Sequence, residues 1–378
     1  MKKPNRRSVL RFLAGLSATS AARPLLEAAA AAPAEAASVR ISRYELIPVR
    51  VPWAGRLRES LILNWRRAGR EEPHLAQTMV RLYTDTGLVG VGESAGEAAA
   101  KRTLGRSPWE FVLDDSLGGA LIAVYDLLGQ ATGVPMCRLF GSPKPRIQPA
   151  FWSHCYPPDL MAAEAKLGAS LGFRIHKVKA RPWEDPVAQA AAISAAVPRD
   201  YRVWADANGF WGSVGRTLQI ARKLAEVPNY FGIESPLRHT EGYRQLRGQV
   251  PLRLAEHYGA LEPMTSIREG LVDAFVVAGR VGRTMIRLNW VGEFYRLPLW
   301  VESNCWTGIG QVFQAHQAAA LPGIEYTINC AHIAEDDLMR EPFTVREGFY
   351  EIPQQPGLGA TLDDDAVEKY RVGKGARS

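Results

Sequence analysis

The sequence has few cysteines, little net charge and no long apolar run, and each absence excludes a class of protein. The four cysteines form no CxxC pair and have no histidine at zinc-finger spacing, which excludes a disulfide scaffold and a cysteine zinc cluster. Residues 1–37 carry +4 of the net charge of +7, because they contain six basic residues and two glutamates. The remaining +3 is too little for a nucleic-acid-binding surface, so we expect no nucleic-acid partner.

The composition is that of a folded globular protein, with 47% hydrophobic and 22% charged residues. A chain of 378 residues is long enough for a β/α barrel of about 250 residues together with a smaller domain. The longest apolar run, near the N-terminus, has about 14 residues, whereas a membrane-spanning helix needs about 20.

The first 37 residues have the features of an export signal. Arg6 and Arg7 are followed by one variable residue, two apolar residues and Arg11, a pattern typical of the twin-arginine signal. An apolar run and a stretch of small residues with A-x-A cleavage sites come next. We therefore predict a twin-arginine-type signal over 1–37, a periplasmic or exported protein, and no membrane attachment after cleavage. The alternative is an amphipathic first helix of the fold.

Residues 38–145 predict a small α+β domain. Three segments in it have the apolar patterning of strands and predict a β-meander: 38–50, 76–83 and 88–91. Residues 116–128 have apolar positions at helical spacing, and Gly129 follows as a helix stop.

Residues 146–342 predict a parallel barrel. Eight short apolar runs alternate there with stretches long enough for a helix: 147–152, 175–178, 201–205, 230–233, 252–255, 273–277, 297–301 and 325–328. An open doubly wound sheet is the alternative, although no GxGxxG motif follows any run. Residues 343–378 are irregular, and we expect them to fold back on the first domain.

Three acidic residues end three consecutive runs of this barrel. Asp206, Glu234 and Glu256 are 28 and 22 residues apart, which is about one β/α unit each. Because a barrel gathers the C-terminal ends of its strands at one mouth, these carboxylates would repel one another unless a divalent cation lay between them. Oxygen ligands suit Mg²⁺, so the sequence predicts a magnesium site.

Lys177 and Lys179 end the second run, two residues apart, so both side chains face the barrel mouth. Two neighbouring ammonium groups lower each other's pKa toward the range of a general base. A base beside Mg²⁺ can remove the proton α to a carboxylate, because the metal stabilises the resulting enediolate. A lone KxK is usually a solvated strand end, but its order and spacing relative to the acids favour the functional interpretation.

Four segments resemble the mandelate racemase/muconate lactonizing enzyme branch of the enolase superfamily. Residues 84–93 (TDTGLVGVGE) are similar to the hairpin of its capping domain, and 125–129 with 134–141 to its next helix and the entry to the barrel. Residues 356–359 (PGLG) resemble its closing segment. The resemblance implies an α+β capping domain on a modified (β/α)7β barrel of the TIM type.

The same resemblance implies roles for individual residues. Lys179 would be the base and Lys177 its support, and Asn208 would orient the substrate or a ligand. Asp206, Glu234 and Glu256 would bind Mg²⁺.

The sequence departs from the family on the face opposite the lysines. The sixth run ends in neither the aspartate of the racemases nor the lysine of the muconate-lactonizing members, and its acid, Asp273, begins the strand. Glu302 ends the seventh run where a histidine would fall, and Asn304 follows it. With Asn208 and His257, Glu302 and Asn304 are the candidate substrate-binding residues.

Three further features have both a functional and a structural interpretation. His154 and His332 lie near the ends of the first and eighth runs, where they could line the mouth or be buried. The basic segment 53–70 is either a lid that recognises an acidic substrate or an exposed loop.

A base on one face favours dehydration of a sugar acid or other hydroxy acid, since racemisation needs proton transfer on two faces. The alternatives are a racemase, epimerase or cycloisomerase of the same superfamily, or a barrel that binds a metal and a carboxylate without catalysis. A metal-dependent hydrolase is disfavoured because the sequence has no HxH motif. The predicted partner is a small carboxylate substrate, and the sequence leaves open whether the chain forms a homo-oligomer.

Overall fold

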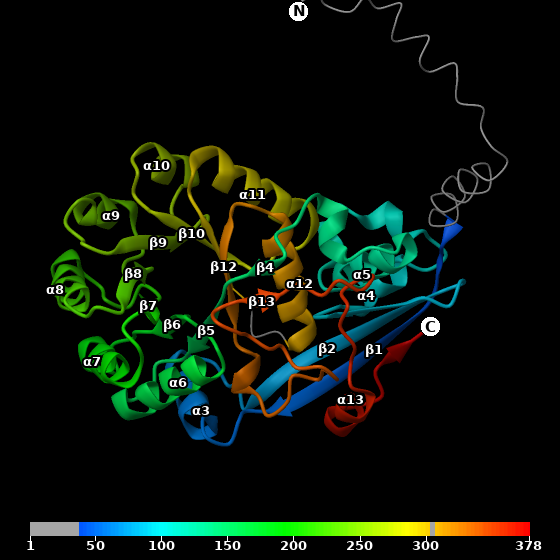
Figure 1. The fold of residues 1–378 in the computed structure, drawn as a ribbon, viewed down its shortest axis with the longest axis horizontal. Coiled ribbons are helices and arrows are strands. Elements are labelled where there is room, and N and C mark those ends of the chain that lie inside the picture. The colour runs from blue at the N-terminus through cyan, green and yellow to red at the C-terminus, as the bar shows by residue number, and fades with distance from the viewer. Residues whose placement is uncertain (1–37, 303–306) are drawn as a thin grey trace, which may run out of the picture.

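The computed structural model describes residues 38–302 and 307–378, which form an antiparallel sheet with helices beside a closed barrel (Figure 1). The predicted signal segment 1–37 and Asn304 lie outside the described residues. None of the described helices is long and apolar enough to cross a membrane.

The N-terminal sheet is the predicted meander with one strand added from the other end of the chain. Its strands are β1 (Ile41–Pro52), β2 (His74–Thr84) and β3 (Val89–Glu93), which pair antiparallel in this order. A short strand, β14 (Ala376–Arg377), pairs with the free edge of β1, so residues near the end of the sequence complete the sheet.

All eight apolar runs are strands, and they close into a barrel because β12 pairs with β5. The barrel strands are β5 (Pro149–Ser153), β6 (Ile175–Lys179), β7 (Arg202–Asp206), β8 (Tyr230–Glu234), β9 (Arg253–His257), β10 (Ala274–Ala278), β11 (Leu299–Glu302) and β12 (Ile324–Asn329). All barrel pairs are parallel, and the pairing of β12 with β5 confirms the closed barrel and excludes the open sheet.

One helix follows each barrel strand except the eighth in the described part of the chain. These helices are α6 (Pro158–Ser170), α7 (Pro186–Ala196), α8 (Val214–Ala225), α9 (Thr240–Leu246), α10 (Pro263–Arg268), α11 (Gly282–Tyr295) and α12 (Gly308–Ala320). β12 is followed by a 3₁₀ turn, Ala331–Ile333. This is the modified (β/α)7β arrangement that the resemblance implied.

The remaining elements join the two parts of the molecule. They are α3 (Arg58–Arg67), α4 (Glu97–Arg102), α5 (Ala120–Thr132), β4 (Arg146–Ile147), β13 (Tyr350–Glu351) and α13 (Asp364–Tyr370), together with 3₁₀ turns at Pro108–Phe111, Asp115–Leu117 and Met136–Phe140. β13 pairs with β4 at the entry to the barrel, and α13 lies beside the N-terminal sheet (Figure 1).

Helix α5 does not end at Gly129, as the sequence predicted, but continues to Thr132. Its C-cap is Gly133, which has a φ of 69°. Gly129 serves close packing instead, because a Cβ atom there would lie 2.6 Å from the Cα atom of Gly357. The glycine therefore marks a backbone contact rather than a helix end.

Aromatic side chains fill the barrel beneath its mouth. Trp204 lies two residues before the end of β7, and its ring centroid is 4.7 Å from that of Trp300 on β11. Both rings are fully buried. The Trp204 indole N–H donates to the Glu234 carboxylate at 2.8 Å, so this core also supports a site residue.

Candidate active site

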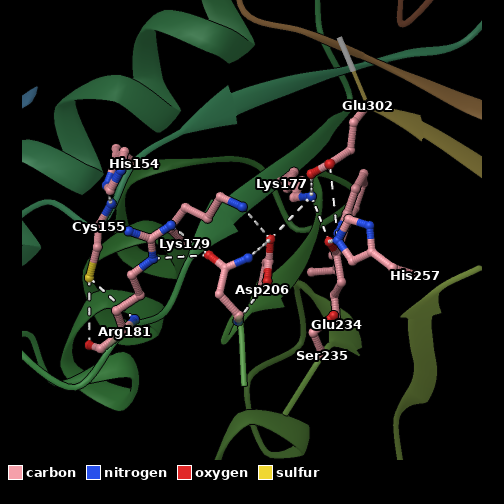
Figure 2. Close-up of polar contacts among 12 residues, drawn as sticks. His154, Cys155, Lys177, Lys179, Arg181, Asp206, Glu234, Ser235, His257 and Glu302 are labelled. Atoms are coloured by element: carbon pink, nitrogen blue, oxygen red, sulfur yellow. Dashed lines mark hydrogen bonds and ion pairs between the residues drawn. The ribbon is translucent and has the colours of Figure 1, made fainter. Parts of the chain in front are cut away.

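The barrel brings the predicted lysines and two of the predicted acids to one mouth. Lys179, Asp206 and Glu234 end β6, β7 and β8, and they occupy matching positions in the parallel register. Their side chains therefore face the barrel interior together, and Figure 2 shows them in one row with Glu302 and His257 at its end.

Lys177 lies deepest and is enclosed by carboxylates. Its Nζ donates to Glu234 Oε1 at 2.7 Å and to Glu302 Oε1 at 2.6 Å, and it lies 3.2 Å from Asp206 Oδ2. Burial alone would lower the pKa of Lys177, but the charges of Glu234, Glu302 and Asp206 hold its pKa well above the ordinary value. The expectation that a lysine neighbour lowers this pKa is therefore wrong for Lys177.

Lys179 reaches the cavity wall, whereas Lys177 has no exposed surface. The Lys179 Nζ lies 2.5 Å from Asp206 Oδ2. Burial alone would raise the pKa of Asp206, but Lys179 and Lys177 keep it well below the ordinary value, so Asp206 stays ionised. The pair thus places an amine on the cavity wall with a carboxylate behind it.

Asn208 holds the Asp206 carboxylate in place. Its backbone N–H donates to Oδ1 at 2.8 Å, and its side-chain amide lies 3.2 Å from Oδ2. Asn208 has a φ of 48°, in the left-handed region that asparagine tolerates better than most residues. The turn after β7 therefore positions the Asp206 carboxylate, and the role of Asn208 in orienting a substrate stays a prediction.

Glu256 faces away from the other acids. Glu234 pairs with Ala255 in the register, so Glu256 is one residue out of phase and points out of the barrel. Its oxygens accept from Ser235 Oγ and from the Tyr243 hydroxyl of α9, both at 2.6 Å. The structure therefore does not bring Glu256 to Asp206 and Glu234, and its role as a ligand stays a prediction.

His257 takes the inward position instead. Its Nε2 lies 3.4 Å from Glu234 Oε1 and 4.0 Å from Glu302 Oε2. Burial alone would lower the pKa of His257, but the hydrogen bond to Glu234 and the charge of Glu302 raise it to about 9.

The donor set at the mouth fits a divalent cation. Among the described residues, Glu234, His257 and Glu302 have ligand atoms that all lie within 4.8 Å of one another. The Asp206 carboxylate lies beside this group, since the same lysine Nζ contacts Asp206, Glu234 and Glu302. Three carboxylates with one imidazole form an oxygen-rich set, which suits Mg²⁺ or a similar hard ion.

A cavity of about 470 Å³ opens above these residues, and both parts of the chain line it. The barrel contributes Lys179, Asn208, His257 and Glu302, among others. The N-terminal part contributes side chains from the basic segment 53–70 and from β2. This volume is enough for a small organic ligand.

The matching family model, described as "Enolase C-terminal domain-like", covers residues 160–366, which is more than half of the chain. The chain belongs to this family. It has the eight-stranded barrel and separate N-terminal sheet of the mandelate racemase/muconate lactonizing branch of the enolase superfamily.

Curated relatives and solved structures of the superfamily show the range of activities around this chain. It is 24% identical over 354 residues to a D-gluconate dehydratase from Thermoproteus tenax, covering 78% of this chain and 69% of that protein. It is 27% identical over 269 residues to an o-succinylbenzoate synthase from Geobacillus kaustophilus, covering 66% of this chain and 68% of that protein.

The fold is also that of the N-succinyl Arg/Lys racemase from Bacillus cereus. That structure matches with a TM-score of 0.72 at 18% identity, covering 90% of this chain and all of that one. With such relatives, this member of the enolase superfamily is an enzyme of the lyase or isomerase type.

The segment 53–70 of this enolase-superfamily chain lies at the mouth rather than in free solvent. Residues 58–67 form α3, and Trp53, Trp65 and Arg70 line the cavity. Arg56 is fixed by Glu164 at 2.8 Å. The segment thus has the position that the lid interpretation requires.

The two histidines near the ends of the first and eighth barrel strands, His154 and His332, have different surroundings. His332 is stacked on Phe151 with ring centroids 3.7 Å apart, and its Nε2 lies 2.9 Å from the Trp152 carbonyl oxygen, which is a packing role. His154, at the end of β5, is completely buried beside Trp65.

Arg181 is a cavity residue that the sequence analysis missed. The available signal was its position two residues after Lys179. Side chains two residues apart on a strand face the same side, so Lys177, Lys179 and Arg181 would all face the barrel mouth. The alternation could not show that the chain stays at the mouth beyond the end of β6.

Proposed function

We propose that this enzyme removes the α-proton of a carboxylate substrate, with Lys179 as the base. The observation that carries the proposal is the contrast between the two lysines. Lys179 lies on the cavity wall beside Asp206, whereas Lys177 is enclosed by Asp206, Glu234 and Glu302. Only Lys179 of this pair can therefore touch a bound substrate.

The carboxylates at the mouth supply a place for Mg²⁺, which would stabilise the negative charge that develops on the substrate carboxylate. Asp206 and Glu234 would hold the ion. Glu256 is the third ligand that the sequence predicts, and Glu302 is a further carboxylate of the mouth, which lines the cavity. Lys177 would stay charged among these acids and contribute positive charge beneath the substrate.

The reaction that we favour is dehydration of a sugar acid or other hydroxy acid. Lys179 takes the proton from Cα, and the electrons of the C–H bond form a double bond as the β-hydroxyl leaves. The ammonium returns the proton to the β-oxygen as its C–O bond breaks, so water is released. Where Cα also carries a hydroxyl, the product is an enol, which loses its O–H proton and takes up a proton at Cβ to become a 2-keto acid. One base on one face is sufficient for this sequence of steps. The dehydratase among the relatives supports this choice.

Racemisation or epimerisation is the second candidate. His257 and Glu302 line the cavity on the side of the row opposite Lys179 and could exchange a proton on the second face (Figure 2). The structural likeness to a racemase concerns the fold alone and does not decide between the reactions.

The test is exchange of the α-proton in deuterated water with a library of sugar acids and acylated amino acids. We expect Lys179→Ala to lower exchange by at least about 10²-fold, the usual contribution of a positioned base. Lys166→Ala, an exposed lysine on α6, is the matched control. Full exchange in Lys179→Ala would overturn the assignment, and the absence of exchange across the library would support a binding protein.

We also propose that the chain is exported by the twin-arginine route, because Arg6 and Arg7 are followed by an apolar run and A-x-A cleavage sites. Replacing both with lysine keeps the charge but removes the specific pair. We expect the precursor to remain in the cytoplasm, and undiminished export would indicate another route.

A further inference from the structure

Three buried hydrogen-bond donors near the cavity have no acceptor among the described residues. They are Trp65 Nε1 of α3, His154 Nε2 after β5 and Arg181 Nη1 after β6. A buried donor without an acceptor costs about 1–3 kcal/mol, and more where the group is charged. Three of them in or beside the wall of one cavity therefore indicate a place where a ligand supplies the acceptors.

His154 is a donor because of the contact that its other nitrogen makes. The Cys155 backbone N–H donates to His154 Nδ1 at 2.7 Å, so Nδ1 carries a lone pair. Burial, with the charges of Arg181 and Lys179, holds the pKa of His154 well below the ordinary value, and the ring is neutral. The proton of a neutral ring must then lie on Nε2, the atom that lacks a partner.

Arg181 is a buried cation without a counter-ion. Its side chain is 6% exposed, and no carboxylate lies within 4.0 Å of it among the described residues. Nε and Nη2 both donate to the neutral Asn208 Oδ1, at 2.9 and 2.7 Å. The guanidinium is thus fixed in place, while no described carboxylate contacts it and its Nη1 atom has no acceptor among the described residues.

Other arginines of the same region differ from Arg181 in this respect. Arg70, which also lines the cavity, pairs with Glu72 at 3.3 Å, and Arg56 pairs with Glu164. Among the described residues, both of these arginines therefore have a carboxylate partner, whereas Arg181 has none.

Two of the three donors line one cavity, and the third, His154, is buried beside two residues of its wall. Trp65 and Arg181 line it, and the His154 ring centroid lies 4.8 Å from that of Trp65 and 5.5 Å from that of Trp152, which also lines it. In Figure 2, His154 and Arg181 lie on one side of the Lys179 Nζ, and Glu234, Glu302 and His257 lie on the other. Lys179 thus stands between a group rich in donors and a group rich in carboxylates.

We propose that Arg181, His154 and Trp65 form a second oxyanion pocket that binds a carboxylate at the far end of the substrate. This inference rests on the proposed function and deepens it, because it names the substrate class as a dicarboxylic acid. One carboxylate lies at the Asp206 and Glu234 end, the other lies against Arg181, and the carbon that loses its proton lies beside Lys179. A guanidinium with a free N–H and a neutral imidazole N–H suit a carboxylate, which accepts several hydrogen bonds.

The experiment compares acids that differ only at the far end. Matched pairs of aldaric and aldonic acids of the same stereochemistry, such as glucarate and gluconate, are titrated into the Mg²⁺-loaded protein while tryptophan fluorescence is followed. Trp53, Trp65 and Trp152 line the cavity and supply the signal. We expect at least one diacid to bind 10-fold or more tightly than its monoacid partner. Equal binding within every pair would overturn the proposal.

Variants separate recognition of the far carboxylate from general damage. Arg181→Gln should lower the diacid preference about 10- to 100-fold, the range for a hydrogen bond between charged groups, and Arg181→Lys should restore part of it. His154→Phe, which keeps a ring between Trp65 and Trp152, should lower the preference several-fold. Arg244→Gln, which replaces an exposed arginine of α9 that pairs with Glu269 and does not line the cavity, should leave the preference within about 2-fold. Equal weakening of both acids by Arg181→Gln would also overturn the proposal.

The binding assay also separates this inference from the proposed function. If Lys179→Ala keeps full α-proton exchange while Arg181→Gln removes the diacid preference, the base assignment fails and the oxyanion pocket stands. If Lys179→Ala abolishes exchange while the wild type binds both acids of each pair equally, the base stands and the pocket fails.

Discussion

Glu93 accepts two hydrogen bonds from Thr307 and thereby fastens the N-terminal sheet to the barrel. Glu93 ends β3, and its Oε2 receives the backbone N–H of Thr307 at 3.0 Å and the hydroxyl at 2.7 Å. The other oxygen receives the backbone N–H of Gly310 at 2.7 Å. A carboxylate from one unit thus caps α12 of the other, where anions are favoured.

Glu93→Gln should change how stability depends on pH. Burial raises the pKa of Glu93 from 4.5 to about 7, although the bonds from Thr307 and Gly310 oppose it. The folded protein therefore binds more protons than the unfolded chain between these values, and its stability falls as pH rises through that window. Glutamine does not titrate. The free energy of unfolding of Glu93→Gln, relative to that of the wild type, should therefore rise by on the order of 3 kcal/mol between pH 4.5 and pH 8.

The measurement is urea unfolding of both proteins across that pH range. Glu71→Gln, which replaces an exposed acid, should show no comparable trend. Parallel pH profiles for wild type and Glu93→Gln would contradict the prediction.

Lys177→Met should destabilise the protein by about 3–5 kcal/mol when metal is removed with EDTA, because it leaves buried carboxylates without their counter-ion. Burial alone would raise the pKa of Glu302, but Lys177, Lys179 and His257 lower it to about 2. The stabilisation from this pairing is present above the unfolded pKa near 4.5 and is lost as pH falls toward 2. The deficit of the variant should therefore be larger at pH 8 than at pH 4.

Urea unfolding at both pH values checks this prediction. Lys166→Met removes an exposed lysine from α6 and should change stability by no more than about 0.5 kcal/mol. If Lys177→Met lost the same free energy of unfolding, relative to the wild type, at pH 4 and at pH 8, Lys177 would act through packing and not through its charge.

Calorimetric titration with Mg²⁺ should separate the two candidates for the third ligand. Glu234→Gln should weaken binding in either case. We expect Glu302→Gln to weaken it more than Glu256→Gln, because both Glu256 oxygens already accept hydrogen bonds on the outer side of β9. A larger loss in Glu256→Gln would show that Glu256 turns inward with metal, as the family resemblance implied.

Replacing either of two helical glycines with alanine should change the stability of the protein, in opposite directions at the two positions. Gly129→Ala would place its Cβ 2.6 Å from the Gly357 Cα atom, so we expect a loss of about 1–3 kcal/mol from overpacking. Gly215 in α8 has no atom within 4 Å of the same added carbon. Gly215→Ala should gain about 0.5–1 kcal/mol from helix propensity. Thermal unfolding of the two variants measures both changes, and a stabilised Gly129→Ala would refute the packing argument.

Much of the fold could be predicted because its signals are local. Each barrel strand is a short apolar run, and the chain must return to the same end of the barrel before each new strand. The strand ends then bring Lys179, Asp206 and Glu234 together without further information.

The direction of Glu256 could not be predicted, because it depends on the register between β8 and β9. A shift of one residue exchanges the inward and outward positions, and no local pattern fixes that shift. The sequence therefore indicated an acid at the right strand end but could not show that His257 would occupy the inward position.

The pocket around Arg181 was equally hidden from the sequence. Trp65, His154 and Arg181 come from three separate elements, and only the packing of α3 over the barrel brings them together. Gly129 was misread for the same reason, since its partner Gly357 is far away along the chain.

The pairing of β14 with β1 has a consequence for the order of events during synthesis. Leu46 pairs with Ala376, which lies 330 positions later in the sequence, so the intervening residues must be synthesised before this sheet can be completed. Contacts that span so many residues form slowly. The barrel sequence is translated earlier and can fold while the sheet still lacks its edge. The unit that covers the active-site mouth is thus completed only after the barrel has been translated.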